Sequence, residues 1–212
     1  MEPLHYKHWP RGVPYCVTLP GTSLVYNLEV SAARYPGKTA ISYYGSSLSY
    51  DQLKSEVDAL AGYLQQGCSV KKGDRVLLYM QNSPQFIVAY YAILRADAVV
   101  VPANPMNLTE EMRHYCEDAG ISVAICASEL LPRIEPLMGE GGLEYAVVAD
   151  YRDYVTESTD IPIPEFFRTI ATEPAISGVK GWEDALTAGL KPGPPLAGPD
   201  DLAAICYTSG TT

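Results

Sequence analysis

The chain has 212 residues, of which 47% are hydrophobic and 19% are charged. This balance excludes an intrinsically disordered protein and predicts a packed core of ordinary size. The formal net charge is -10, from 25 acidic and 15 basic residues. Such a charge repels a phosphate backbone, so we expect no nucleic-acid partner.

Cysteine usage points to a reducing compartment. The 5 cysteines include no Cys-x-x-Cys pair, which fits neither a disulfide framework nor a zinc site, and we expect no bound structural metal. The start MEPLHYKHWPRG is polar and interrupted by proline, unlike a signal peptide, and no apolar run approaches the roughly 20 residues of a membrane helix. We therefore expect a soluble, cytoplasmic protein without a transmembrane segment.

The N-terminal part predicts an arm followed by a hairpin. Residues 1–22 are rich in proline and glycine, which predicts an irregular arm. His5 and His8 have the spacing of a metal pair, but without further ligands nearby they are more simply exposed polar residues. From Thr39 the stretch TAISYYGSSLSY predicts a β-hairpin that turns around residues 45–47.

Helices and short apolar strands then alternate. A helix begins after Ser49, with Gln52 at capping-box spacing, and ends at Gly67. Strands are predicted at 74–80, 98–103, 122–127 and 144–149, and further helices from Ser83 and Pro84, at 109–119 and at about 129–138. Continuous apolar strands separated by helices indicate an α/β fold with a mostly parallel sheet, flanked by helices on both faces. Ligands of such sheets bind beyond the carboxyl ends of the strands.

The last quarter of the chain changes character. Prolines recur through residues 150–201, and only GWEDALTAG suggests a helix, so we interpret this stretch as a long connection. A last strand, LAAICY, follows at 202–207. The predicted organisation is an irregular arm at 1–22, an α/β subdomain at 23–149, the Pro-rich connection at 150–201, and a strand with the start of a loop at 202–212.

The terminal stretch has the composition of a phosphate-binding loop. Such a loop needs backbone N–H groups near the ligand, glycine where a side chain would block approach, and hydroxyls that donate to anionic oxygens. The residues that supply these groups are Thr208, Ser209, Gly210, Thr211 and Thr212. The same residue types are common in solvated turns, and the chain has neither a Walker loop nor a G-x-G-x-x-G fingerprint. Composition alone leaves both interpretations open.

Three motifs resemble those of the adenylate-forming enzymes, which include acyl-CoA synthetases, firefly-type luciferases and peptide-synthetase adenylation domains. Residues 207–212 match the first six positions of the family's phosphate loop, Y/F-T-S-G-T-T-G-x-P-K-G. LSYDQL at 48–53 resembles L-S/T-Y-x-E-L, and AILRADAVVVPANP at 92–105 resembles L-K-A-G-A-x-x-x-P-x-x-P. The motifs keep the family's order, so the resemblance covers nearly the whole chain. Asp97 stands where the family usually has glycine, at a helix-to-strand turn that Asp often tolerates.

The resemblance implies a ligase that activates a carboxylic acid with MgATP as an acyl-adenylate and passes the acyl group to a thiol, commonly coenzyme A. By the same resemblance, residues 208–212 would hold the β and γ phosphates. It places the catalytic lysine, the acyl pocket and the C-terminal domain beyond Thr212, so we expect no catalytic residue within this chain. We expect the chain to be the inactive N-terminal part of a longer ligase, separated by an artificial boundary, by proteolysis or by an interrupted gene.

The acid is predicted from weaker cues. The proline-rich N-terminal stretch and VVVPANPMNLTEEMRHYCEDAG look more like fatty acyl-CoA ligases than peptide-synthetase modules. The alternative within the class is an aryl-acid or coumarate-type CoA ligase. Two alternatives from other classes are a non-catalytic nucleotide-binding module and an interaction protein that remains from a decayed ligase.

Two further features bear on partners and chemistry. His114 and Cys116 suggest a nucleophile, but no paired base is visible, so packing is the better interpretation. A partial chain exposes surface that the missing half would cover, so we expect homo-oligomers, or poor order in residues 150–201.

Overall fold

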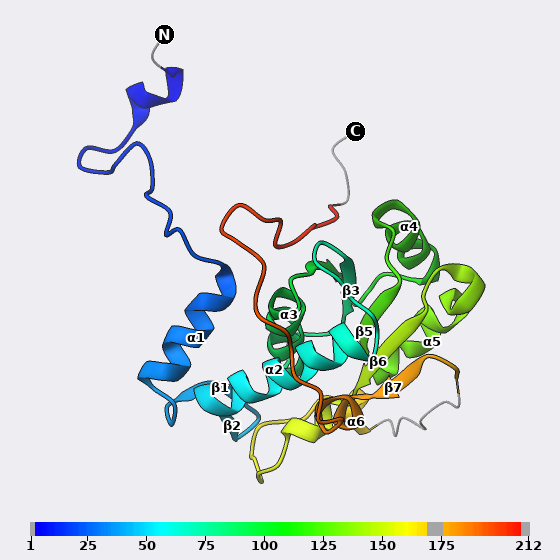
Figure 1. Ribbon diagram of the computed structural model, residues 1–212. Coiled ribbons are helices and arrows are strands. Elements are labelled where there is room, and N and C mark those ends of the chain that lie inside the picture. The colour runs from blue at the N-terminus through cyan, green and yellow to red at the C-terminus, as the bar shows by residue number, and fades with distance from the viewer. Residues whose placement is uncertain (1–2, 169–175, 209–212) are drawn as a thin grey trace.

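A parallel sheet forms the centre of the protein (Figure 1). The computed structural model describes residues 3–168 and 176–208. Within these residues the sheet has the strand order β4-β3-β5-β6-β7, and every neighbouring pair is parallel. Its strands are β3 (Arg75–Tyr79), β4 (Val99–Ala103), β5 (Val123–Ala127), β6 (Tyr145–Ala149) and β7 (Val179–Gly181). Strand β5 is buried at every residue, which accounts for its continuous apolar run and confirms the predicted α/β fold.

Helices cover both faces of this sheet. On one side α1, α2, α3 and α6 pack together, and α4 and α5 pack together on the other (Figure 1). They are α1 (Leu24–Arg34), α2 (Tyr50–Gln66), α3 (Pro84–Arg95), α4 (Thr109–Ala119), α5 (Leu131–Ile134) and α6 (Trp182–Leu186). Buried side chains from the helices and strands form one continuous hydrophobic cluster.

The predicted helix boundaries are confirmed where capping residues mark them. Ser49 Oγ accepts a hydrogen bond from the Gln52 amide at 3.2 Å, and Gln52 Oε1 accepts one from the Ser49 amide at 2.9 Å, which completes the capping box of α2. Ser83 caps α3 in the same way. Gly120, with φ of 61°, ends α4 in the left-handed conformation that glycine adopts without strain.

The helix predicted at about 129–138 is wrong. In its place lie a 3₁₀ turn (Ser128–Leu130), the four-residue α5, and a second 3₁₀ turn (Glu135–Leu137). Pro132 and Pro136 lack the amide hydrogen that a continuous helix would use, so the chain breaks into short turns.

The N-terminal region contains elements beyond those predicted. A short 3₁₀ turn (Leu4–His8) interrupts the arm, and α1 begins at Leu24, just after the end of the arm. The hairpin consists of β1 (Thr39–Tyr43) and β2 (Ser46–Ser49). Its turn consists of Tyr44 and Gly45, which both have positive φ, so it lies one residue earlier than expected.

Residues 150–201 contribute to the core as well as connecting elements. Within them β7 pairs in parallel with β6, and Trp182 of α6 is buried. Strand β7 was not predicted, because its three residues, VKG, carry no apolar run. Beyond α6 the chain crosses α2 and α3 and returns toward β4 (Figure 1).

Candidate functional site

The predicted phosphate loop is described at its first residue. Thr208 is exposed, and Ser209, Gly210, Thr211 and Thr212 lie outside the described residues. The structure therefore describes how the chain approaches this loop. The approach consists of residues 190–207.

The chain reaches the loop along the edge of β4. The Val100 amide donates to the Ala203 carbonyl at 3.0 Å, and the Ile205 amide donates to the Val100 carbonyl at 2.9 Å. This pairing is parallel and limited to one bridge residue, Ala204, where the sequence predicted a strand over 202–207. Because the pairing is parallel, Thr208 follows at the carboxyl end of the sheet, where ligands of α/β proteins bind.

Helix α4 holds the residue that precedes the loop. The ring of Tyr207 stacks on Tyr115, with centroids 4.1 Å apart and planes inclined by 15°. The Tyr207 hydroxyl donates to the carboxylate of Asp118. Desolvation, the hydrogen bond to Asp118 and the charge of that carboxylate raise the pKa of Tyr207 to about 12. Sequence reasoning matched Tyr207 to the family motif but gave no signal for its partners on α4.

The guanidinium group of Arg133 forms hydrogen bonds to the neighbouring loop between β4 and α4. Arg133 Nη1 donates to the carbonyls of Pro105 at 2.7 Å and Asn107 at 2.9 Å, and to the Tyr79 hydroxyl at 3.1 Å. Asn107 Nδ2 in turn donates to the hydroxyl of Tyr115 at 3.1 Å. Tyr115, on which Tyr207 stacks, is thus linked through Asn107 and Arg133 to Tyr79 at the carboxyl end of β3.

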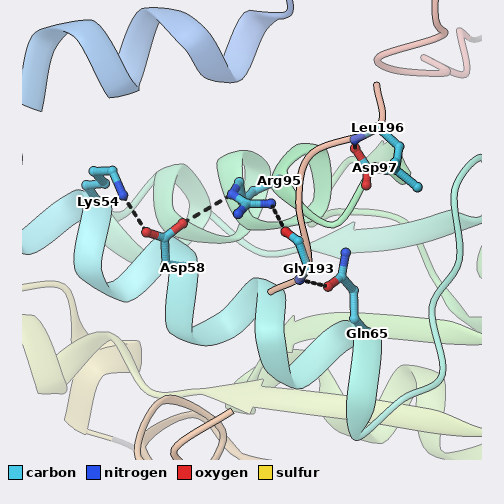
Figure 2. A network of polar contacts seen from close by, with 7 residues as sticks. All are labelled: Lys54, Asp58, Gln65, Arg95, Asp97, Gly193 and Leu196. Carbon is cyan, nitrogen blue, oxygen red and sulfur yellow. Dashed lines mark hydrogen bonds and ion pairs between the residues drawn. The ribbon is translucent and has the colours of Figure 1, made fainter. Parts of the chain in front are cut away.

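A segment that we call the strap, residues 190–201, is fixed across α2 and α3 (Figure 2). The Gly193 amide donates to Gln65 Oε1 at 2.8 Å, and Arg95 Nη1 donates to the Gly193 carbonyl at 3.0 Å. Arg95 also lies 3.3 Å from Asp58, which forms a 2.5 Å ion pair with Lys54. Helices α2 and α3 therefore both hydrogen-bond to the backbone of the same strap residue, Gly193.

Further along, the strap is held at the start of β4. Asp97 Oδ1 accepts hydrogen bonds from the amides of Leu196 and Ala197, both at 2.8 Å. Lys72 Nζ donates to the Leu196 carbonyl at 3.1 Å and forms a 2.9 Å ion pair with Asp201. The sequence placed Asp97 at a permissive turn, and its φ of 62° confirms this, but its role as an acceptor was not predicted.

Two polar clusters were missed because their members are far apart in the sequence. At the carboxyl ends of the strands, burial raises the pKa of Glu129, and both Glu129 Oε1 and Gln85 Oε1 are buried without a hydrogen-bond partner among the described residues. A cavity of about 200 Å³ is lined in part by Glu56, Asp153 and Glu183. The Tyr154 hydroxyl donates to Glu56 at 2.5 Å, and burial raises the pKa of this carboxyl group.

Cys116, which the sequence suggested as a nucleophile, is buried on α4. Burial raises the pKa of Cys116 to about 11, which makes its thiol a poor nucleophile at neutral pH. His114 packs its ring near Tyr207. No group of three or more His, Cys, Asp and Glu residues among the described ones has a geometry suited to a metal ion, and none of the described helices meets the length and hydropathy of a membrane span.

The fold is that of an α/β domain, a parallel sheet with helices on both faces. In this class of fold, ligands bind beyond the carboxyl ends of the strands. A family profile described as "AMP-binding enzyme" matches residues 28–212. The chain belongs to this family.

Relatives agree with this family assignment, and solved structures agree with the fold. The chain is 31% identical to a long-chain-fatty-acid–CoA ligase of Bacillus subtilis over 96% of its own length and 37% of the relative. It is 30% identical to the ligase of the same name from Escherichia coli O6:H1, over 90% of its length and 35% of that protein. The crystal structure of the anthranilate CoA ligase AuaEII with anthranoyl-AMP matches with a TM-score of 0.72 at 22% identity, covering 92% of this chain and 34% of that one. The N-terminal subdomain of Klebsiella oxytoca NpsA matches with a TM-score of 0.60 at 20% identity, covering 91% and 40%.

Proposed function

We propose that the chain is the N-terminal part of an ATP-dependent acid–thiol ligase that activates a fatty acid as an acyl-adenylate and transfers it to coenzyme A. The observation that carries the proposal is the family membership of residues 28–212, together with relatives named long-chain-fatty-acid–CoA ligases. The chain spans little more than a third of those relatives. The activity is therefore proposed for the longer protein, and the 212 residues alone are expected to be inactive.

In this proposal Thr208, Ser209, Gly210, Thr211 and Thr212 hold the β and γ phosphates of ATP. The support from the described residues is the parallel approach of residues 203–205 along β4, which directs the loop to the carboxyl edge of the sheet. Hydroxyls and backbone amides suit an anionic ligand, and Mg²⁺ bound with ATP would neutralise part of the phosphate charge. The chain's own contribution is to bind and orient the phosphates.

The test is acid-dependent ATP–pyrophosphate exchange by the protein at its natural length. A fatty acid such as palmitate should support exchange, and Thr208→Val should reduce it about tenfold or more, because an aimed donor to the phosphates is lost. Thr18→Ala, in the exposed arm, is the matched control. Exchange that needs benzoate and not palmitate would favour the aryl-acid alternative, which the structural similarity to the anthranilate CoA ligase also suits.

The remaining alternatives give different results in the same assay. A non-catalytic nucleotide-binding module would bind MgATP without acid-dependent exchange. An interaction protein would do neither and would form oligomers, for which exposed Leu196 and Leu202 offer apolar surface.

A further inference from the structure

Asp97 stands at a backbone position that favours glycine. Its φ is 62°, in the left-handed region, at the turn between α3 and β4. Most residues with a side chain are strained there, although Asp and Asn tolerate it better than others. The motif of the adenylate-forming enzymes that residues 92–105 resemble usually has glycine at this turn. A residue that keeps a side chain in such a conformation calls for a reason beyond the turn itself.

The carboxylate of Asp97 supplies that reason. Asp97 is only 6% exposed, and its Oδ1 accepts a hydrogen bond of 2.8 Å from the Leu196 amide (Figure 2). The next strap amide, that of Ala197, donates to the same oxygen at 2.8 Å. A carboxylate that leaves water needs such donors. Glycine would relieve the backbone but would leave both amides without this acceptor.

The strap amides that Asp97 holds lie a few residues before the segment that pairs with β4, which in turn leads to Thr208. Asp97 begins the short run that leads into β4, and Val100, three residues later, exchanges backbone hydrogen bonds with Ala203 and Ile205. The approach segment is thus held at two points of one rigid element, before and after the exposed residue Leu202. Thr208, the first residue of the predicted loop, follows three residues beyond Ile205.

We infer that Asp97 is a positioning residue for the phosphate loop, acting through the strap amides and the pairing of residues 203–205 with β4. The inference rests on the proposed function for what the loop holds. It assigns to Asp97 no contact with ATP or substrate. It also explains why an acidic side chain replaces the usual glycine.

The test compares Asp97→Gly with Asp97→Asn in the protein at its natural length. Asp97→Gly removes the acceptor and relieves the left-handed turn, so the variant should fold. Asp97→Asn keeps an acceptor oxygen and a residue type that tolerates positive φ. Amide hydrogen exchange is measured by NMR at Leu196, Ala197 and Ile205, with Ile121, which donates to the Cys116 carbonyl at the end of α4, as the internal control.

In Asp97→Gly we expect exchange to become about tenfold faster at all three amides, because each loses a bond or the register that protects it. We expect Asp97→Asn to stay near the wild-type protein, and Ile121 to stay unchanged in both variants. Unchanged exchange at Ile205, with faster exchange at Leu196 and Ala197, would overturn the inference, because the tether would then be local.

A second readout is the ATP–pyrophosphate exchange assay. Asp97→Gly should raise the KM for ATP about threefold to tenfold and leave the KM for the acid unchanged, and Asp97→Asn should restore the wild-type value. A KM for ATP that does not change in Asp97→Gly would also overturn the inference. A wild-type protein without acid-dependent exchange would reject the proposed function, and the hydrogen-exchange result at Ile205 would still decide whether Asp97 positions the approach.

Discussion

Replacing Gly62 with alanine tests whether the strap packs against α2 as the structure describes. Gly62 is buried in the middle of this helix, and a β-carbon there would lie 2.5 Å from the Leu190 carbonyl oxygen and 2.8 Å from the Lys191 carbonyl carbon. Alanine in a helix interior is favoured over glycine by about 1 kcal/mol. Overpacking against backbone atoms costs about 1–3 kcal/mol. The backbone of the strap cannot rotate away as a flexible side chain would, so the upper part of this range, about 2–3 kcal/mol, applies. With the helix gain subtracted, we expect Gly62→Ala to lower the free energy of unfolding by about 1–2 kcal/mol.

The assay is urea unfolding followed by circular dichroism, with amide exchange at Gly193 as a local probe of the strap. Gly37→Ala is the matched control, because no heavy atom lies within 4 Å of its β-carbon position. This control should be unchanged or more stable by up to about 1 kcal/mol. If Gly62→Ala were as stable as the wild-type protein and kept the protection of Gly193, the close packing of the strap on α2 would be refuted.

Three further predictions concern other parts of the molecule. Trp182→Ala should lower the free energy of unfolding by about 3–5 kcal/mol, because Trp182 is 2% exposed and fills the core beside α2; a loss below about 1 kcal/mol by urea unfolding would contradict this. Asp118→Asn should lower the pKa of Tyr207 from about 12 toward its ordinary value, because a hydrogen-bonded negative charge is removed, and an unchanged titration of labelled tyrosine in NMR spectra would contradict this. Desolvation and the neighbouring charges of Asp150 and Glu183 raise the pKa of Asp153 to about 6, so the folded protein keeps a proton that the unfolded chain releases near pH 4. Stability should therefore fall as pH rises between these values, and Asp153→Asn should flatten that part of the urea-midpoint profile; a parallel profile in the variant would contradict the assignment.

Local patterns in the sequence predicted four strands of the sheet and four of the helices around it, α2, α3, α4 and α6. The apolar runs of β3 to β6 are continuous because both faces of each strand are buried, and this signal needs no knowledge of partners. The capping box of α2, Ser83 before α3 and Gly120 after α4 are equally local, since each satisfies backbone groups within a few residues. The three motifs that indicated the family are also short, and the family assignment confirmed them.

The elements that the sequence predicted wrongly or missed have physical reasons of their own. Apolar side chains between 129 and 138 suggested a helix, but Pro132 and Pro136 interrupt its hydrogen bonding. Strand β7 has no apolar pattern and exists because β6 offers it an unpaired edge. The strand expected at 202–207 shrinks to one bridge, since its residues meet β4 at Val100 alone.

The sequence by itself determined the class of fold, the family and the residues proposed to hold phosphate, because these depend on short runs and local backbone chemistry. Only the tertiary structure decided how the chain approaches that loop. Asp97 and Leu196 are 99 positions apart in the chain, and Tyr207 and Asp118 are 89 apart. Contacts of this kind leave no periodic trace in the sequence, because they arise only after the sheet and helices have packed and brought distant segments together.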